Sequence, residues 1–484
     1  MKNSLQIMPE LSGQKYFSDF NVNSLHIDSR EVKEEGVFFA IKGNRLNGND
    51  FIEEAVARGA ALIISDEHRN KKNIVYCNYL REYLGIVASR FFSDPSKKLT
   101  TFCATGTNGK TTSVESFAQL CKKLGYKCGY LSTIGKSING NKIEESTTLT
   151  TPDPIYLNHS FSEMVLNGST YAAIEASSHG LDQNRLNGID IDYGVLTSFS
   201  QDHLDYHESI KNYEEAKSIL FKKLNPKNSI IQIDSDFGQR LYKDIAGINQ
   251  NVFCVSLTKD SDYFADFKRD KGQLNVSLKS PYGVDEFSLS TVSKYLASNV
   301  ICSMVALNIE GVKMNRLAEI VSEISFPSGR LERISIGKKD VCYLDYAHTP
   351  DALKNALNEI RDNHEGQIWC VFGCGGDRDK DKRPIMGAIA EKYSDHVVVT
   401  DDNPRNESSK KIINDILAGI NETSKVHSIS DRKKAIKFAL EEMESREGKN
   451  IMLLAGKGHE NYQLIGPDKN YFDDKKTVIS LLKK

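Results

Sequence analysis

The chain has 484 residues, of which 63 are Lys or Arg and 65 are Asp or Glu, so its formal net charge is −2 at pH 7. Charges of both signs are interspersed and create no broad basic field, which argues against nucleic acid or an anionic membrane as a partner. The length exceeds what one compact core supports, and about three domains of ordinary size fit.

The pattern of cysteines and apolar runs indicates where in the cell the protein is found. The nine cysteines form no paired C-x-x-C clusters, and several lie in apolar runs, where free thiols pack as small hydrophobic groups. No run of about 18 apolar residues occurs, and the first 20 residues lack the apolar core and cleavage site of a signal peptide. We therefore expect a cytoplasmic chain that does not insert into membranes.

The first section of the chain, to about residue 95, contains short apolar runs at residues 36–41 and 61–65 with an amphipathic stretch at 51–58 between them. Apolar runs of this length are typical of buried strands, and the stretch between them is typical of a helix. This pattern predicts a small α/β domain.

A glycine-rich segment at residues 104–112, Ala-Thr-Gly-Thr-Asn-Gly-Lys-Thr-Thr, joins an apolar run to an amphipathic run. Such a turn exposes backbone N–H groups at a helix N-terminus, where negative charge is favoured, and Lys110 adds a point charge for a phosphate. Thr111 would offer its hydroxyl to Mg²⁺. Only the second half of the common G-x-x-x-x-G-K-[ST] pattern is met, because Ala104 replaces its first glycine. The segment indicates a phosphate-binding loop.

The rest of the chain alternates strand-like and helix-like stretches, which predicts mainly parallel sheets. The strands expected up to residue 328 cover residues 171–175, 193–197 and 229–233. Those expected beyond it cover residues 341–345, 368–372, 396–400 and 451–455, each followed by a loop with Gly, Asp or His. Ligands of open α/β sheets bind at such strand ends.

Two polar clusters follow predicted strands. Glu175 ends an apolar strand where it could hold a divalent cation near phosphates, although a strand-terminal Glu is equally often a helix cap or a surface charge. Residues 201–207 contain two His and two Asp. Zinc could also use such a cluster, but no further ligands follow at finger spacing, and Mg²⁺ prefers oxygen ligands.

Four segments, at residues 105–112, 175–181, 202–207 and 345–350, resemble the signature motifs of the Mur ligase family and occur in the family's order. The resemblance covers nearly the whole chain. Within the family, it is strongest to members that add the third amino acid to UDP-N-acetylmuramoyl-L-alanyl-D-glutamate. It implies a three-domain α/β architecture, with a UDP-MurNAc-binding domain at 1–95, a central P-loop ATP-binding domain at 96–328 and a Rossmann-like, amino-acid-binding C-terminal domain at 329–484.

The resemblance also implies a reaction. ATP phosphorylates the substrate carboxylate, and the incoming amine attacks the acyl phosphate and releases phosphate. The residues implied in catalysis are Lys110, Lys217, His203 and Asp345. The residues implied in Mg²⁺ binding are Thr111, Glu175, His203 and Lys217, the last as N6-carboxylysine (a carbamate). Without the family, a lysine in an acidic helical stretch reads as a solvated side chain paired along the helix.

The family's binding positions map onto three sets of residues. ATP contacts fall on Gly106, Thr107, Asn108, Gly109, Lys110, Thr111, Thr112, Asn299, Arg330 and His348. Contacts to the UDP-MurNAc-dipeptide fall on Ile27, Ser29, Asn44, Arg45, Leu46, Leu149, Thr150, Thr151, Ser177, Gln183 and Arg185. Contacts to the incoming amino acid fall on Arg378, Asp402, Asn403, Pro404, Arg405, Gly456 and Glu460.

The segment Asp402-Asn403-Pro404-Arg405 matches the motif of family members that select meso-diaminopimelate, whose distal carboxylate an arginine can bind with two hydrogen bonds. Lysine has no such carboxylate, so it would leave Arg405 unpaired. Read without the family, the same four residues after a strand are a good turn sequence. The choice of meso-diaminopimelate therefore depends on the resemblance.

Two alternatives remain open. A related ligase with the same ATP chemistry, such as a lysine-adding member or a folylpolyglutamate synthase, is disfavoured by residues 402–405. A non-catalytic nucleotide-binding scaffold could lose Glu175, Lys217 and Asp345, yet all three are present. We expect a monomer whose domains close on the substrates, because an acyl phosphate must be kept from water. Ser198 departs from the family, which commonly has asparagine there.

Overall fold

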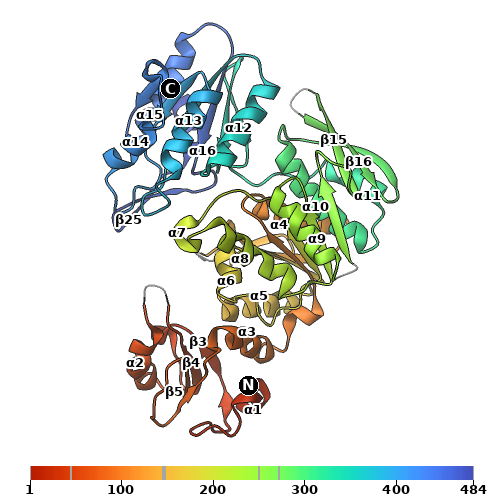
Figure 1. The fold of residues 1–484 in the computed structure, drawn as a ribbon, viewed down its shortest axis with the longest axis vertical. Helices are drawn as coiled ribbons and strands as arrows, with labels where there is room; N and C mark the ends of the chain where they lie inside the picture. Colours follow the sequence, from red (N-terminus) through yellow and green to blue (C-terminus); the bar gives the residue numbers. More distant parts are fainter. Residues whose placement is uncertain (1, 44–45, 144–148, 249–250, 271–272, 483–484) are drawn as a thin grey trace.

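A computed structural model describes residues 2–43, 46–143, 149–248, 251–270 and 273–482. Three large sheets, each with its own helices, follow one another along the long axis of the molecule (Figure 1). The N-terminal sheet lies at one end, the largest sheet lies in the middle, and the C-terminal sheet lies at the other end. The α/β class expected from the sequence is confirmed.

The N-terminal sheet is parallel, with its four strands in the order β3-β4-β5-β6. Its strands are β3 (Ser24–His26), β4 (Gly36–Ala40), β5 (Ala60–Ser65) and β6 (Ile74–Tyr76). Its helices are α1 (Ser4–Ile7), α2 (Ile52–Ala57) and α3 (Leu80–Phe91), and a small antiparallel pair joins β1 (Lys2–Asn3) to β2 (Asn21–Val22). All five residues of β4 are buried, as a strand covered on both faces requires.

The central sheet has eleven strands in the order β10-β9-β8-β11-β7-β12-β13-β14-β15-β16-β17, and the pairs from β8 to β15 are parallel. Those with parallel neighbours are β7 (Thr100–Thr105), β8 (Cys128–Ser132), β11 (Tyr171–Glu175), β12 (Tyr193–Leu196), β13 (Asn228–Gln232), β14 (Val252–Ser256) and β15 (Tyr263–Asp270). The others are β9 (Gly135–Ile138), β10 (Asn141–Ile143), β16 (Gln273–Ser280) and β17 (Gly283–Leu289).

Helices cover both faces of the central sheet and bury two apolar cores. One face carries α4 (Lys110–Lys123), α10 (Lys294–Ile309) and α11 (Met314–Val321). The other carries α5 (Pro154–Leu166), α6 (Ser178–Asp182), α8 (Ile210–Lys222) and α9 (Asp236–Ala246), and the short α7 (Leu204–His207) precedes α8. Burial on both faces explains why the parallel strands read as continuous apolar runs.

The antiparallel edge formed by β15, β16 and β17 differs from the mainly parallel sheet expected. Along β16 buried and more exposed residues alternate, whereas β11 and β12 are buried throughout. A strand with one solvated face shows this period of two. The alternation in the sequence is the signal that separates this edge from the parallel core.

The C-terminal sheet has six strands in the order β18-β19-β23-β20-β21-β22, all parallel except β18. They are β18 (Glu332–Ile336), β19 (Asp340–Asp345), β20 (Gln367–Phe372), β21 (His396–Val399), β22 (Val426–Ser428) and β23 (Asn450–Ala455). The helices are α12 (Pro350–Asn363), α13 (Lys382–Tyr393), α14 (Ser409–Leu417), α15 (Arg432–Ser445) and α16 (Asp474–Leu482), with a hairpin of β24 (Tyr462–Ile465) and β25 (Asp468–Tyr471).

The central and C-terminal domains contact each other through β15 and α10 on one side and α12 on the other. Arg269 on β15 lies 3.1 Å from a carboxylate oxygen of Glu359 on α12, and the backbone N–H of Lys294 donates to the other oxygen at 2.9 Å. Glu359 therefore bridges β15 and the first residue of α10.

Among the described residues, no helix is long and apolar enough to cross a membrane.

Candidate functional site

The phosphate loop connects β7 to α4. Gly106 and Gly109 have φ of 153° and 91°, and a Cβ atom would lie 2.1 Å from the Thr197 hydroxyl and 2.3 Å from the Asn299 amide oxygen, respectively. Glycine is therefore required at both positions, because it adopts these φ values and leaves room for the neighbouring side chains. The loop ends at the N-terminus of a 14-residue helix, where backbone N–H groups favour an anion.

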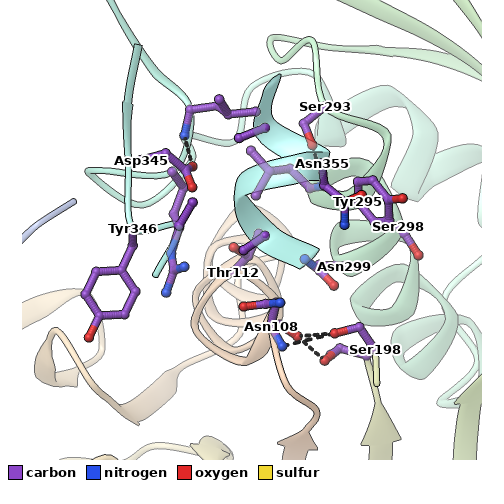
Figure 2. A pocket seen from close by; sticks show the side chains of 18 of the residues that line it. Asn108, Thr112, Ser198, Ser293, Tyr295, Ser298, Asn299, Asp345, Tyr346 and Asn355 are labelled. Carbon is purple, nitrogen blue, oxygen red and sulfur yellow. Dashed lines mark hydrogen bonds between the residues drawn. The ribbon is translucent and has the colours of Figure 1, made fainter. Parts of the chain in front are cut away.

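Ser198 supports this loop from the segment after β12. Its hydroxyl accepts a hydrogen bond from the N–H of Asn108 and lies 3.0 Å from the carbonyl oxygen of the same residue (Figure 2). Ser198, which stands where the family commonly has asparagine, therefore still makes a polar contact with the phosphate loop.

The Lys110 side chain folds back over the loop. Its Nζ donates to the carbonyl oxygens of Gly106 at 2.8 Å and Thr107 at 3.0 Å. Burial lowers the pKa of this ammonium, and Glu175 and Asp202 partly offset the effect. The amine lies where it can contact a phosphate that the loop binds.

Glu175 is almost fully buried at the end of β11. The N–H of Thr133 donates to one of its carboxylate oxygens at 2.9 Å, and the Thr133 hydroxyl lies 3.1 Å from the other. These bonds fix the carboxylate in the cleft that also exposes Lys110 and Thr111. Nothing in the sequence around Thr133 indicated this supporting contact.

Asp202 lies between two imidazoles that come from different domains. Its Oδ2 is 3.4 Å from Nε2 of His203 and 3.9 Å from Nε2 of His348. Burial lowers the pKa of His203, which favours the neutral imidazole that a metal ligand requires. Burial also lowers the pKa of His348.

Lys217 is buried on α8, and its Nζ lies 4.4 Å from the centre of the Tyr213 ring. In the parts of the chain that the structure describes, no carboxylate lies within 4.0 Å of this amine. Burial and the charge of Lys110 lower its pKa well below the usual value, with Asp202 opposing. Among the described residues, the amine is therefore held without a directly paired carboxylate.

A hollow beside the phosphate loop is formed by both large domains (Figure 2). The start of α10 contributes Tyr295 and Asn299, and α12 contributes Asn355. Arg330 lies in the segment between the two domains, with its guanidinium 4.9 Å from the centre of the Tyr346 ring. Asp345 faces the same hollow, and the N–H of Leu331 donates to its carboxylate at 2.7 Å.

A second cleft of about 590 Å³ lies between the central and C-terminal domains, within the size range of small-molecule sites. It is lined by residues expected to contact ATP, Mg²⁺, the muramoyl dipeptide and the incoming amino acid, but by none of the described residues of the N-terminal domain. These are Thr107, Asn108, Gly109, Lys110, Thr111, Thr150, Glu175, His203, Arg330, His348, Arg378, Asp402, Asn403, Arg405, Gly456 and Glu460.

Residues at the ends of β21 and β23 form a hydrogen-bonded network in this cleft. The Asn403 amide donates to Glu460 at 2.8 Å, and Nζ of Lys457 lies 3.3 Å from both side chains. A Cβ atom on Gly456 would lie 2.4 Å from an Asp402 carboxylate oxygen. Lys457 is fully buried, and its place in this network was not predicted, although it lies beside Gly456.

Arg405 follows β21 in the left-handed region, with φ of 52°. Its NH1 donates to the carbonyl oxygen of Gly376 at 2.8 Å. Arg378 comes from the loop after β20 and lines the same cleft. Two guanidinium groups thus face one space from two loops, an arrangement suited to carboxylates.

The residues mapped to the dipeptide form a connected group behind Glu175. The Thr151 hydroxyl lies 2.8 Å from the Glu175 carbonyl oxygen and 3.0 Å from the Ser177 hydroxyl. Arg185 donates to the Thr151 carbonyl oxygen at 2.7 Å and to Gln183 at 2.8 Å. The group is fixed before any substrate contact.

The residues mapped to the UDP end are more scattered. Ile27 and Leu46 expose 41% and 69% of their surface, and Leu149, which precedes the Thr150-Thr151 pair mapped to the dipeptide, exposes 44%. Ser29 is buried and donates to Glu54 at 2.6 Å. The predicted contacts at Asn44 and Arg45 lie outside the described residues. Pro404 is buried beside Arg405.

Known proteins resemble this chain along its whole length. Residues 21–106, 104–307 and 329–458 match the family models described as "Mur ligase family, catalytic domain", "Mur ligase middle domain" and "Mur ligase, glutamate ligase domain". A UDP-N-acetylmuramoyl-L-alanyl-D-glutamate–2,6-diaminopimelate ligase 1 of Clostridium acetobutylicum is 38% identical over 99% of this chain and 98% of its own.

Two further proteins carry nearly the same name. The ligase of Haemophilus influenzae (strain 86-028NP) is 34% identical, covering 98% of both chains. A solved structure entitled as the structure of such a ligase has a TM-score of 0.69 and 33% identity, covering 96% of this chain and 95% of its own.

Proposed function

This chain belongs to the Mur ligase family, and we propose that it is an ATP-dependent ligase that joins meso-diaminopimelate to UDP-N-acetylmuramoyl-L-alanyl-D-glutamate in peptidoglycan precursor synthesis. The observation that carries this proposal is the single cleft that contains both Lys110 of the phosphate loop and Arg405 of the C-terminal domain. A ligase must bring a phosphorylated carboxylate and an amine together in one enclosed space.

ATP binds with its phosphates on residues 106–112 and its base and ribose in the hollow near Asn299 and Arg330. The lining of that hollow by the phosphate loop, α10 and α12 supports this orientation. Lys110 stabilises the charge of the transferring phosphoryl group, and His348 approaches from the C-terminal domain. Asp345 fixes the segment that carries Arg330 through its bond to the N–H of Leu331.

Thr111 and Glu175 hold Mg²⁺ beside the phosphates, with His203 as a further ligand. The fit is supported by the donor set, since a hydroxyl and an oriented, buried carboxylate are oxygen ligands that suit this ion together with substrate phosphates. When bound, the ion neutralises charge on the phosphates. Among the described residues, no group of three or more His, Cys, Asp and Glu forms a protein-only metal site.

Lys217 is the site of N6-carboxylation and, as the carbamate, a ligand of a second Mg²⁺. Its burial and the absence of a carboxylate partner within the described chain support this assignment. The uncharged amine attacks CO₂, a nitrogen–carbon bond forms, and a proton is released to solvent. In ¹³C-bicarbonate, we expect a carbamate signal in the NMR spectrum that Lys217→Met abolishes. An unchanged spectrum in the variant would contradict the assignment.

The muramoyl dipeptide lies along Thr150, Thr151, Ser177, Gln183 and Arg185, and its UDP end reaches the N-terminal domain at Ile27, Ser29 and residues 44–46, with Leu149 between. Arg185 suits a substrate carboxylate. The sheets support domain boundaries at residues 1–95, 96–328 and 329–484, because among the described residues no sheet contains strands from two of these sections. The nine free, buried cysteines fit a reducing cytoplasm. A monomer stays our prediction.

Meso-diaminopimelate is the amino acid because the cleft offers two guanidinium groups, Arg378 and Arg405, to a substrate with two carboxylates. Asp402, Asn403, Gly456 and Glu460 complete its site, and acidic side chains there suit its ammonium groups. Lysine would leave one of the two guanidinium groups without a carboxylate partner, which disfavours it. The second candidate function is that of a lysine-adding ligase, which is supported only by the ATP chemistry that the two kinds of ligase share.

The test is phosphate release from ATP, Mg²⁺ and UDP-MurNAc-L-Ala-D-Glu, with meso-diaminopimelate or L-lysine at equal concentrations. We expect release with meso-diaminopimelate alone, and Arg405→Ala should raise its KM while the KM of ATP stays unchanged. Arg361→Ala, which removes an exposed ion pair of the same domain, is the matched control. Release with lysine alone would overturn the substrate, and release with neither would favour a nucleotide-binding scaffold.

A further inference from the structure

A buried arginine that no substrate can reach lies directly behind the two arginine-bearing loops. Arg383, in the first turn of α13, has a fully buried side chain. Its guanidinium donates twice to the Glu407 carboxylate, at 2.9 and 3.1 Å, and once to Asp415 of α14 at 2.8 Å. It also donates to the carbonyl oxygen of Gly375 at 3.2 Å. One side chain thus contacts both loops.

Glu407 extends this contact to the loop after β20. The carboxylate that binds Arg383 also accepts a hydrogen bond from the N–H of Asp377 at 2.6 Å. In return, Asp377 accepts from the Asn406 side-chain amide at 2.8 Å. Glu407 lies two residues after Arg405, and Asp377 lies one residue before Arg378. The bonds therefore join the immediate neighbours of the two candidate substrate-binding arginines.

The two loops also pack backbone against backbone, with little room for adjustment. A Cβ atom on Gly376 would lie 1.9 Å from the Pro404 carbonyl oxygen. The N–H of Gly376 donates to the Asn403 carbonyl oxygen at 2.9 Å. Asp377 and Arg405 both have φ near the left-handed region, at 53° and 52°, a conformation that surrounding contacts must maintain in residues other than glycine.

We propose that Arg383 and Glu407 are positioning residues that fix the distance between Arg378 and Arg405, and so set the selectivity for an amino acid with two separated carboxylates. The inference rests on the proposed function, since it needs the cleft to bind such an amino acid. Two guanidinium groups on independent loops would accept many spacings, whereas loops tied together by one buried ion pair present a single spacing. The loops then need little further ordering when an amino acid with two carboxylates binds, so the entropy cost of binding is small.

Glu407→Gln is the main test, because it removes the charge of the carboxylate that joins the loops and keeps its size. Asp415→Asn is the matched control: it removes a second carboxylate from the same guanidinium, but this one lies on α14 and contacts neither loop. For both variants the KM values of meso-diaminopimelate, ATP and the UDP substrate are measured by phosphate release. The fluorescence of Trp369, the single tryptophan, which is buried in the C-terminal sheet, reports folding.

We expect Glu407→Gln to raise the KM of meso-diaminopimelate about tenfold or more, because small misplacements of binding groups carry large costs, while the other two KM values stay within about twofold. Asp415→Asn should change none of the three. Equal effects of the two variants, or a parallel change of all three KM values in Glu407→Gln, would overturn the proposal and leave a purely structural ion pair.

The wild-type enzyme separates this inference from the proposed function. If it releases phosphate with meso-diaminopimelate and Glu407→Gln behaves as Asp415→Asn does, the function stands and the positioning role fails. If it uses L-lysine instead, both fail, because an amino acid with one carboxylate cannot require a fixed pair of arginines. Should Glu407→Gln unfold, Arg383→Lys, which keeps the charge but loses the planar fork, is expected to show the same selective rise in KM.

Discussion

The phosphate loop and the two arginine-bearing loops both face the cleft with positive charge, but they are built differently. The phosphate loop is one continuous segment whose backbone N–H groups and Lys110 point at the same place, with glycines at the positions that require them. Arg378 and Arg405 come from separate loops that follow two neighbouring strands, and a buried ion pair behind them joins those loops. The first site is encoded locally, whereas the second depends on the assembled sheet.

This difference means that a change in one site should leave the other nearly intact. Damage to the phosphate loop should stop phosphoryl transfer without changing the affinity for the amino acid. Damage behind the arginines should change the affinity for the amino acid without changing that for ATP. Contacts at the boundary between the domains should affect both sites weakly.

Lys110→Met tests the phosphate loop alone and should have the largest effect. Loss of one preorganised charge at a transferring phosphoryl group costs about a hundredfold to a thousandfold in turnover. Phosphate release measures the turnover, and calorimetric titration of meso-diaminopimelate should give an unchanged Kd. Lys122→Met, an exposed lysine in the last turn of the same helix, is the control. Near-normal turnover of Lys110→Met would contradict this role, because the backbone N–H groups alone would then stabilise the transferring phosphoryl group.

Asp345 sharpens the comparison because it belongs to the C-terminal sheet but faces the nucleotide hollow. Burial raises the pKa of its carboxyl to about 6. Between pH 4 and 6 the folded state therefore binds a proton that the unfolded state has released, so stability falls as pH rises through this range and is level above it. Asp345→Asn lacks this titration and keeps an oxygen that can accept from the N–H of Leu331.

The free energy of unfolding of the wild type should therefore fall relative to that of Asp345→Asn by about 2 kcal/mol between pH 4 and 7, allowing for partial contact with solvent. Urea unfolding followed by Trp369 fluorescence measures this difference in the domain that contains both residues. A difference that is independent of pH would contradict the raised pKa.

Gly376→Ala tests the packing between the two arginine-bearing loops. The new Cβ atom would clash with a backbone oxygen that has no flexible side chain to move, so the loops must separate. We expect the KM of meso-diaminopimelate to rise about tenfold while that of ATP is unchanged. Gly247→Ala, where the nearest atoms lie 3.9 Å away, should have no effect. A rise in the KM of ATP would show that the two sites are not independent.

Arg269→Ala removes the ion pairs with Glu359 and Asp362 that join β15 to α12 and should have the smallest effect. The Arg269 side chain is partly exposed, so the loss of these pairs should raise the KM of ATP only about threefold, through looser placement of α12 against the hollow. Arg240→Ala, which removes an ion pair within the central domain, is the matched control. Equal KM values in the two variants would leave no role for the interdomain pair.

The sequence predicted most of the parallel strands because burial on both faces makes them continuous apolar runs. The strand expected at residues 171–175 is β11, and the amphipathic run that follows the glycine-rich segment is α4, which begins at Lys110. The antiparallel edge from β15 to β17 was not predicted, because its alternating pattern describes a half-exposed strand rather than a buried one.

The candidate site divides in the same way. Local motifs in the sequence predicted the phosphate loop, whose glycines and Lys110 lie in one continuous segment, and Glu175 at the end of an apolar strand. Thr133, Lys457 and Arg383 were not predicted, because each contacts a residue from another segment, Glu175, Asn403 and Glu407 respectively, and only the folded domains bring these segments together. The roles given to individual substrate-binding residues, including Asn44 and Arg45, stay predictions.

The central claim is that one cleft transfers a phosphoryl group to a substrate carboxylate and then delivers an amine to it. The most direct measurement uses UDP-MurNAc-L-Ala-D-Glu with ¹⁸O in the glutamate side-chain carboxylate and follows the released phosphate by mass spectrometry. An acyl phosphate predicts that one ¹⁸O atom enters phosphate for each peptide bond formed with meso-diaminopimelate. Phosphate without ¹⁸O, alongside full peptide-bond formation, would contradict the account.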